Sequence, residues 1–225
     1  MQKYFILLLL ITANTFAQVT HYQLEDEEID TIFTDNLKQE LGLDFEIFSV
    51  YQYNDTSGKH FLVFTENTYY ELGEIKKMDG IEGFDIKKDD DNYNLLYTIE
   101  DYLDKDIEEV SLWFWTKYLN LDDLDGDGFA DIIITYGSHA SNLYDDGRIR
   151  IVIIYKNKKI EISHKNGVED GERNTKVDKV FYNLPISIQE KVKSIMERIA
   201  EAEHGIFPAG WQEALNQKKT YFDEN

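Results

Sequence analysis

The chain contains no cysteine among its 225 residues. Disulfide bonds and thiol catalysis are therefore excluded, and so is the cysteine-linked lipid that anchors bacterial lipoproteins. The five histidines lack metal-ligand spacing such as H-x-x-x-H. No glycine-rich phosphate loop follows a strand-like segment, and no nucleophile elbow surrounds Ser138-His139. Because these catalytic motifs are missing, the sequence favours a non-enzymatic protein and assigns no catalytic residue.

Basic residues are scarce, since 23 Lys and Arg stand against 44 Asp and Glu for a net charge of −21. Residues 18–131 carry 30 acidic and 8 basic side chains, whereas residues 132–225 carry 14 of each. Such a negative field repels polyanions, so neither nucleic acid nor an anionic membrane surface is an expected partner. It suits a cation or a basic partner, and it is equally what a solvated surface needs for solubility.

Long apolar runs are also missing, so we expect no membrane span, which takes about twenty residues. A short apolar run over residues 4–11 follows Lys3 and precedes Thr15-Phe16-Ala17. This order is typical of a secretory signal peptide cut after Ala17, with a signal anchor as the alternative. We predict a signal peptide at 1–17, a single α+β domain over 18–225, and export to the periplasm or the outside of the cell, not as a lipoprotein.

The densest group of chemistry-bearing residues is a D-x-D-x-D-G-x-x-D pattern over residues 123–131. Calcium takes six to eight oxygen ligands at about 2.3–2.6 Å, and alternate residues of a tight loop can supply them. Gly128 suits the sharp bend that such a loop needs. The sequence predicts calcium as the cofactor, and an acidic turn without metal is the alternative. The predicted ligands are the carboxylates of Asp123, Asp125, Asp127 and Asp131 and the backbone carbonyl of Phe129.

The residues after the loop distinguish it from an EF-hand. An EF-hand needs a glutamate at its twelfth position, which is Ile134 in this chain. Residues 132–136 are β-branched or aromatic and predict a strand. The pattern is similar to the calcium loops of FG-GAP and integrin α-chain repeats. Those proteins build propellers from several copies, and this chain has one copy, so their fold is not implied.

The remaining patterns predict an α+β fold, with an antiparallel β-sheet of meander and hairpins and a C-terminal amphipathic helix packed on it. Strand-like runs at 45–51 and 60–65 flank a turn, and runs at 148–155 and 159–164 form a second hairpin. A short helix is expected at 34–41. Ser187 and Glu190 suggest a capping box for the last helix. Its apolar stripe is Ile188, Val192, Ile195, Met196 and Ile199.

Two further features are candidate contact surfaces. Trp113 and Trp115 lie two apart in a predicted strand, so both rings face one side of it. They belong either to the core or to a sugar-stacking platform. The polar loop over residues 137–147 follows the predicted metal-loop strand, and loops beside a rigid site often carry function.

Several segments taken together resemble a family of secreted bacterial proteins described as surface polysaccharide biosynthesis proteins. These segments are residues 57–63, 123–137, 145–149, 165–167, 172–179 and 207–214. The resemblance implies a role in making or exporting lipopolysaccharide or capsule, with an envelope polysaccharide or a polysaccharide-assembly protein as partner. We therefore predict a secreted or periplasmic, non-enzymatic, calcium-binding accessory protein. The alternatives are a glycan- or protein-binding module of the envelope and a hydrolase of envelope polymers.

Overall fold

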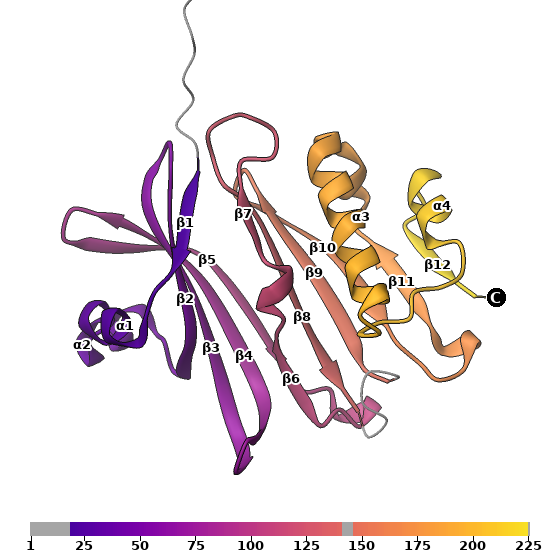
Figure 1. Cartoon of the computed structure of the whole chain (residues 1–225), viewed down its shortest axis with the longest axis horizontal. Helices are drawn as coiled ribbons and strands as arrows, with labels where there is room; N and C mark the ends of the chain where they lie inside the picture. Colours follow the sequence, from indigo (N-terminus) through magenta and orange to yellow (C-terminus); the bar gives the residue numbers. More distant parts are fainter. Residues whose placement is uncertain (1–18, 141–145, 225) are drawn as a thin grey trace, which may run out of the picture.

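The computed structural model describes residues 19–140 and 146–224 (Figure 1). The predicted signal peptide at 1–17 lies outside the described residues, as do residues 141–145 of the candidate loop at 137–147. Over the described ranges the fold is mainly β, with two antiparallel sheets and few helices. No helix within those ranges is long and apolar enough to cross a membrane.

The first sheet is a meander in which each strand pairs with the next, in the order β1-β2-β3-β4-β5. Its strands are β1 (Thr20–Gln23), β2 (Glu46–Asp55), β3 (Gly58–Leu72), β4 (Ile75–Asp89) and β5 (Asn92–Tyr102). The second sheet has the order β12-β11-β10-β9-β8-β6, and β7 also pairs with β8. Its strands are β6 (Ser111–Phe114), β7 (Asn120–Asp122), β8 (Asp131–His139), β9 (Arg148–Tyr155), β10 (Lys158–Lys165), β11 (Asn174–Val177) and β12 (Tyr221–Asp223).

The helices lie on the outer sides of the two sheets, so that Figure 1 shows helices, sheet, sheet and helices in succession. The α-helices are α1 (Asp26–Ile32), α2 (Asp35–Leu41), α3 (Ile186–Glu201) and α4 (Trp211–Asn216). Short 3-10 turns occur at η1 (Lys105–Ile107), η2 (Thr116–Tyr118), η3 (Asp170–Glu172) and η4 (Lys179–Asn183).

In the central strands of each sheet both faces are buried, which explains their unbroken apolar runs. Phe61 and Val63 of β3 pack with Phe33, which follows α1. Leu62 and Phe64, on the opposite face of β3, belong to the core between the sheets. The apolar runs of β8 and β9 divide in the same way between the inter-sheet core and the core under α3.

The apolar stripe of α3 packs on the second sheet, which confirms the predicted helix and its buried face. Ile188, Val192, Ile195, Met196 and Ile199 are each at most 1% exposed and share a core cluster with residues of β9 and β10. A fully buried aliphatic side chain contributes about 1.5–3 kcal/mol, so this stripe is a large part of what holds α3 in place. The predicted capping box is wrong, because Pro185 is the N-cap and Ser187 lies inside the first turn.

The coarse α+β prediction is confirmed, whereas the expected single sheet is wrong because the chain forms two. Both predicted hairpins are present, as β2–β3 and β9–β10. The expected short helix is α2, which Thr34 caps and Gly42 ends in the left-handed conformation. The full length of β3 and β4, each of 15 residues, was not predicted from the sequence.

Candidate functional site

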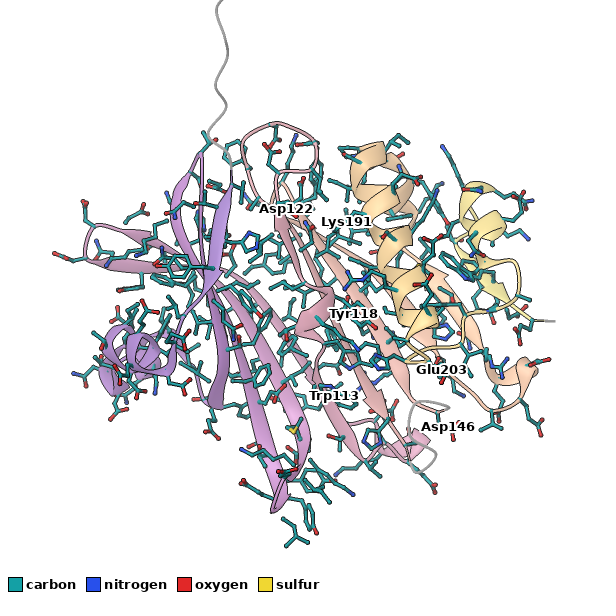
Figure 2. All side chains as sticks on the ribbon, in the orientation of Figure 1. Trp113, Tyr118, Asp122, Asp146, Lys191 and Glu203 are labelled. Carbon is teal, nitrogen blue, oxygen red and sulfur yellow. The ribbon has the colours of Figure 1, made fainter. Side chains whose placement is uncertain are left out.

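The acidic loop over residues 123–131 connects β7 to β8. Asp122, the last residue of β7, pairs with Asp131, the first residue of β8, at the base of the loop. Figure 2 shows Asp122 at one end of the second sheet, far from Trp113 toward the other end. The loop wraps around the carboxylate of Asp123. Oδ1 of Asp123 accepts hydrogen bonds from the amides of Gly126 at 2.7 Å and Asp127 at 3.0 Å, and Oδ2 accepts one from the amide of Gly128 at 2.8 Å.

Three of the predicted metal ligands converge. Asp123, Asp125 and Asp131 each place a carboxylate oxygen within 4.8 Å of the others. Asp131 is 2% exposed, and its Oδ2 accepts a hydrogen bond from the amide of Leu124 at 2.8 Å. Burial, followed by the nearby charges of the other loop aspartates, raises the pKa of Asp131 to about 6. Such a group of carboxylates is costly to keep ionised without a cation, and its oxygen-only chemistry suits a hard ion.

The other two predicted ligands are placed differently. Oδ2 of Asp127 lies 2.8 Å from Nζ of Lys156, in the turn between β9 and β10. Its Oδ1 accepts a hydrogen bond from the amide of Phe129 at 3.0 Å. Burial is the largest single influence on Asp127 and opposes its ionisation. The hydrogen bonds from Lys156 and from the Phe129 amide, together with the positive charge of Lys156, outweigh burial and hold the pKa of Asp127 below its ordinary value. Asp127 therefore faces a lysine here, outside the group of three, and the ring of Phe129 is exposed beside a cavity.

Hydrogen bonds connect the acidic loop to the turn of the β2–β3 hairpin. The amide and the hydroxyl of Thr56 both donate to the carbonyl oxygen of Gly128, at 2.9 Å and 2.6 Å. Oδ2 of Asp55 accepts a hydrogen bond from the amide of Ala130 at 3.2 Å. Gly128 has φ of +88°, and a Cβ at this position would overlap the hydroxyl oxygen of Thr56. Glycine is thus required both for the bend and for the close approach of the hairpin.

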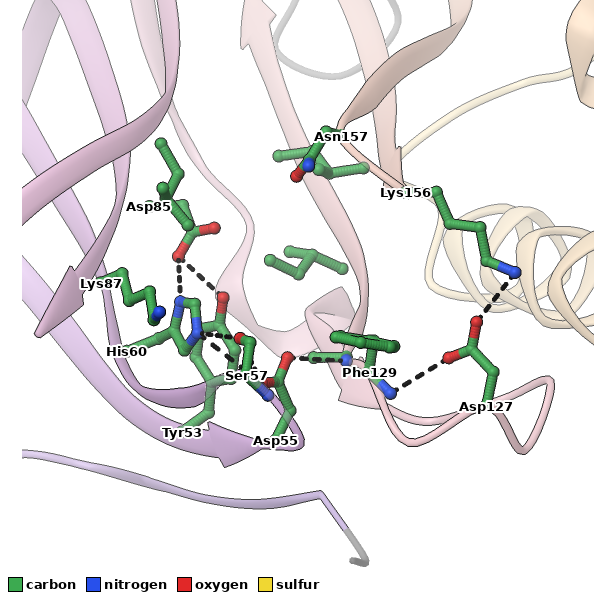
Figure 3. A pocket seen from close by; sticks show the side chains of 14 residues that line it. Tyr53, Asp55, Ser57, His60, Asp85, Lys87, Asp127, Phe129, Lys156 and Asn157 are labelled. Atoms are coloured by element: carbon green, nitrogen blue, oxygen red, sulfur yellow. Dashed lines mark hydrogen bonds and ion pairs between the residues drawn. The ribbon is translucent and has the colours of Figure 1, made fainter. Parts of the chain in front are cut away.

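A cavity of about 510 Å³ opens between the two sheets, beside the acidic loop. Figure 3 shows a cluster of polar side chains from β2, β3 and β4 on one side of it, with Lys156 on the opposite side. The lining residues are Tyr53, Asp55, Ser57, His60, Asp85, Lys87, Leu96, Asp127, Phe129, Ala130, Ile132, Ile154, Lys156 and Asn157. This volume lies within the range of small-molecule sites, about 300–1,000 Å³.

One group in this cavity has the composition of a nucleophilic catalytic site, and it consists of Ser57, His60 and Asp85. Oγ of Ser57 lies 2.7 Å from Nε2 of His60, and Nδ1 of His60 lies 3.6 Å from Oδ1 of Asp85. The hydroxyl of Tyr53 donates to the same Asp85 oxygen at 2.7 Å. The imidazole also stacks on the ring of Tyr53, with centroids 4.6 Å apart. The ring orientation of His60 is therefore fixed by contacts on several sides.

The sequence alone did not indicate this group. His60 was one of five histidines without metal-ligand spacing, and Asp85 lay in none of the predicted elements. The register of β3 and β4 pairs Leu62 with Asp85, which brings that carboxylate beside His60. The one local signal was the pair Ser57 and His60, three residues apart across the end of a tight turn.

The other sequence candidates are placed as follows. Trp115 is 4% exposed and belongs to the core under α3, and the partly buried Trp113 packs against the same cluster. This placement favours the core over a sugar-stacking platform. Ser138 is buried, and its hydroxyl donates to Oε1 of Glu109. His139 follows it in β8 and therefore faces the other side of the sheet, beside Trp113, so the two do not form a catalytic pair.

Comparison of the chain with protein-family models, with curated proteins and with solved structures finds no match. The chemistry of the loop and of the cavity is therefore inferred from their own geometry.

Proposed function

We propose that residues 123–131 bind calcium and that the protein is a calcium-binding accessory protein of the bacterial envelope, supporting surface polysaccharide biosynthesis. The observation that carries the metal assignment is the approach of Asp123, Asp125 and Asp131, whose carboxylate oxygens lie within 4.8 Å of one another. Asp127 and the carbonyl of Phe129 complete the proposed ligand set. Asp127 joins the set by leaving Lys156.

Calcium fits this donor set better than other common ions. The proposed ligands are all oxygens, which disfavours the softer zinc and copper ions. Magnesium demands a near-ideal octahedron, whereas calcium accepts the irregular geometry of a flexible loop. The amides of Gly126, Asp127 and Gly128 already hold the Asp123 carboxylate at the centre of the loop. Ordering by calcium would then need little rearrangement of the backbone.

The proposed role of the ion is to hold the two sheets together at one end. Asp123 follows β7 and Asp131 begins β8, so both are anchored in the second sheet. Thr56 and Asp55 tie the same loop to the β2–β3 hairpin of the first sheet. A ligand that binds only the folded state stabilises it by about 2.7 kcal/mol at a hundred times its dissociation constant. Calcium would therefore act as a clamp on the fold.

The role in the envelope rests on the sequence resemblance and on the proposed signal peptide at residues 1–17. Both support export to the periplasm or to the outside of the cell, where calcium is supplied from the medium. The proposed partner is an envelope polysaccharide or a protein that assembles one. The marked negative charge, −21 over the whole chain, suits a partner that is neutral or basic.

Titration calorimetry and thermal unfolding test the metal assignment directly. Calcium should raise the melting temperature of the wild-type protein, and EDTA should lower it again. Asp131→Asn should remove most of the calcium response, because it replaces a buried ligand charge by a neutral amide of similar size. Asp91→Asn is the matched control at an exposed turn and should behave like wild type. A wild-type protein that shows no heat and no thermal shift at millimolar calcium contradicts the metal assignment.

The biological role has a separate test. Deleting the gene should reduce or alter surface polysaccharide, and expression of the wild-type protein should restore it. Asp125→Ala and Asp127→Ala should restore it only in part, in proportion to the folded protein that remains. Unchanged polysaccharide in the deletion strain would contradict the envelope role and leave calcium binding untouched.

A further inference from the structure

We propose that Ser57, His60 and Asp85 form a hydrolytic site, in which Ser57 attacks a neutral carboxylic ester held in the cavity between the sheets. Ser57 is the nucleophile, His60 the general base, and Asp85 the positioning residue. This activity goes beyond calcium binding and uses none of the proposed metal ligands as a reacting group.

The first support is the pairing of an exposed hydroxyl with a buried base. Ser57 is exposed in the hairpin turn, whereas His60 is 3% exposed in β3, and their reacting atoms lie 2.7 Å apart. A serine hydroxyl becomes a useful nucleophile when an adjacent base accepts its proton. The distance is that of a hydrogen bond, so proton transfer to Nε2 of His60 needs rotation of the hydroxyl proton and no movement of the heavy atoms.

The second support is the environment of the other ring nitrogen. Nδ1 of His60 is buried and has no hydrogen-bond partner among the described residues, and it faces Oδ1 of Asp85 at 3.6 Å. Catalytic hydrogen bonds are often long before the substrate is bound and tighten in the complex. Tyr53 holds the Asp85 oxygen in place from the other side, and burial keeps the pKa of Tyr53 far above its ordinary value, so its hydroxyl remains a donor.

The third support is charge around the imidazole. Asp55 places Oδ1 at 3.6 Å from Nε2, and Asp85 places Oδ1 at 3.6 Å from Nδ1. Both carboxylates are largely buried, so they stabilise the imidazolium that forms during attack. Oδ1 of Asp55 also accepts from the hydroxyl of Ser57 at 2.6 Å. The resting hydroxyl therefore lies between two acceptors, and attack draws its proton to His60.

The cavity indicates the class of substrate. Leu96, Phe129, Ile132 and Ile154 provide an apolar wall for an acyl group. The lysines of the lining are balanced, since Lys156 pairs with Asp127 and Lys87 lies 3.0 Å from Asp89. A site without net positive charge suits a neutral ester. The Lys87–Asp89 pair is partly exposed and therefore weak, so the Lys87 ammonium is available to face the negative oxygen of the tetrahedral intermediate.

The reaction balances with water as the only co-reactant. Oγ of Ser57 bonds to the carbonyl carbon of the ester while its proton passes to Nε2 of His60. The intermediate collapses, the C–O bond to the alcohol breaks, and His60 gives the proton to the departing alkoxide. Water then attacks the acyl-serine, His60 accepts the water proton, and that proton returns to Oγ of Ser57 as the carboxylic acid leaves.

Two measurements on the full chain test the proposal. A fluorophosphonate probe should label Ser57, as located by peptide mass spectrometry, and p-nitrophenyl butyrate should be hydrolysed. Ser57→Ala should abolish labelling, and both Ser57→Ala and His60→Gln should lower hydrolysis at least about 100-fold. Asp85→Asn should lower kcat and leave KM unchanged, because Asp85 acts through His60. Ser187→Ala, at an exposed serine of α3, is the matched control and should match wild type.

A Ser57→Ala protein that melts like wild type and hydrolyses the ester equally fast overturns the proposal, and so does a probe adduct only at other serines. The outcome is separable from calcium binding. Ser57→Ala should still show the calcium-dependent rise in melting temperature, because Thr56 and residues 123–131 are intact. A wild-type protein that shows no calcium response but is labelled at Ser57 would contradict the metal assignment and leave the hydrolytic site standing.

Discussion

Thr56 donates two hydrogen bonds to the carbonyl oxygen of Gly128, which lies 72 residues further along the chain. One residue therefore joins the turn of the β2–β3 hairpin to the acidic loop of the second sheet. Ser57 follows Thr56 directly, so the loop also sets where the proposed nucleophile lies. We therefore expect order in the loop to reach the cavity through this carbonyl, together with the hydrogen bond from the Ala130 amide to Asp55.

Thr56→Val should weaken this connection without changing the shape of the side chain. It removes the hydroxyl bond to Gly128 and keeps the amide bond, so we expect a loss of about 0.5–1.5 kcal/mol in the free energy of unfolding. Hydrogen exchange checks the coupling. Calcium should slow exchange of the Ser57 and Gly58 amides in the wild-type protein and slow it less in Thr56→Val. Equal protection in both proteins would show that the Thr56 hydroxyl does not carry the coupling between loop and turn.

Gly128→Ala and Gly126→Ala should separate the cost of backbone strain from the cost of a clash. Both glycines have positive φ, +88° and +79°. A Cβ at Gly126 meets nothing within 4 Å, whereas one at Gly128 overlaps the Thr56 hydroxyl. Gly126→Ala should therefore cost about 1 kcal/mol from the left-handed backbone alone. Gly128→Ala should cost clearly more in urea unfolding, and equal losses would contradict the tight contact between hairpin and loop.

Lys156→Met should increase calcium affinity if Asp127 is a ligand. Lys156 holds Oδ2 of Asp127 at 2.8 Å, and removing the ammonium frees this carboxylate for the ion. Titration calorimetry should then give a smaller dissociation constant than for wild type. Lys158→Met removes one positive charge from the same turn without breaking an ion pair of the loop, and it controls for the change in net charge. Matching increases in the two variants would show a general charge effect only.

The features that short-range patterns determine were predictable from the sequence. The apolar stripe of α3 depends on a repeat of three and four residues, and the β9–β10 hairpin depends on one turn. The convergence of Asp123, Asp125 and Asp131 also follows from spacing within one loop. In each case the residues that decide the structure lie within a few positions of one another.

The cavity depends on pairings that spacing does not encode. His60 and Asp85 meet only because β3 and β4 pair in one register over most of their length. Asp127 faces Lys156 only because the β9–β10 turn packs beside the loop. Local patterns also gave no reason to expect a second sheet, since sheet membership is decided by which strands pair across the whole chain.

Arg148→Met should be strongly destabilising. Nε of Arg148 donates to Oε1 of Glu109 at 2.7 Å, and Nη1 donates to Asp101 of the first sheet at 2.9 Å. The Glu109 side chain is 0% exposed, so the variant leaves a buried carboxylate without its cation. Breaking such a pair from one side costs about 3–5 kcal/mol. The double variant Arg148→Met, Glu109→Gln should recover part of this loss in urea unfolding. If it recovers nothing, the loss comes from the packing of the Arg148 side chain and not from the unpaired carboxylate.

His164 should make the protein less stable in mild acid. It is 2% exposed, and its ring nitrogens lie 2.9 Å from Oγ1 of Thr175 and 2.8 Å from Oδ1 of Asn166. Burial is the main cause that lowers its pKa from the ordinary 6.5 to about 4. The unfolded chain therefore takes up a proton first as the pH falls. The contribution of His164 to the free energy of unfolding is fully present above pH 6.5 and is lost between pH 6.5 and about pH 4. At about 1.4 kcal/mol per pH unit, the loss is about 3 kcal/mol.

The contribution of His164 can be isolated from that of the many carboxylates by comparing differences. Urea unfolding in EDTA, near neutral pH and again near the lowered pKa, gives the acid-dependent loss for each protein. His164→Gln should lose about 3 kcal/mol less than wild type between the two conditions, because glutamine does not titrate. His21→Gln, at an exposed position of β1, should lose as much as wild type. An equal loss in His164→Gln and His21→Gln would mean that folding leaves the pKa of His164 at its ordinary value.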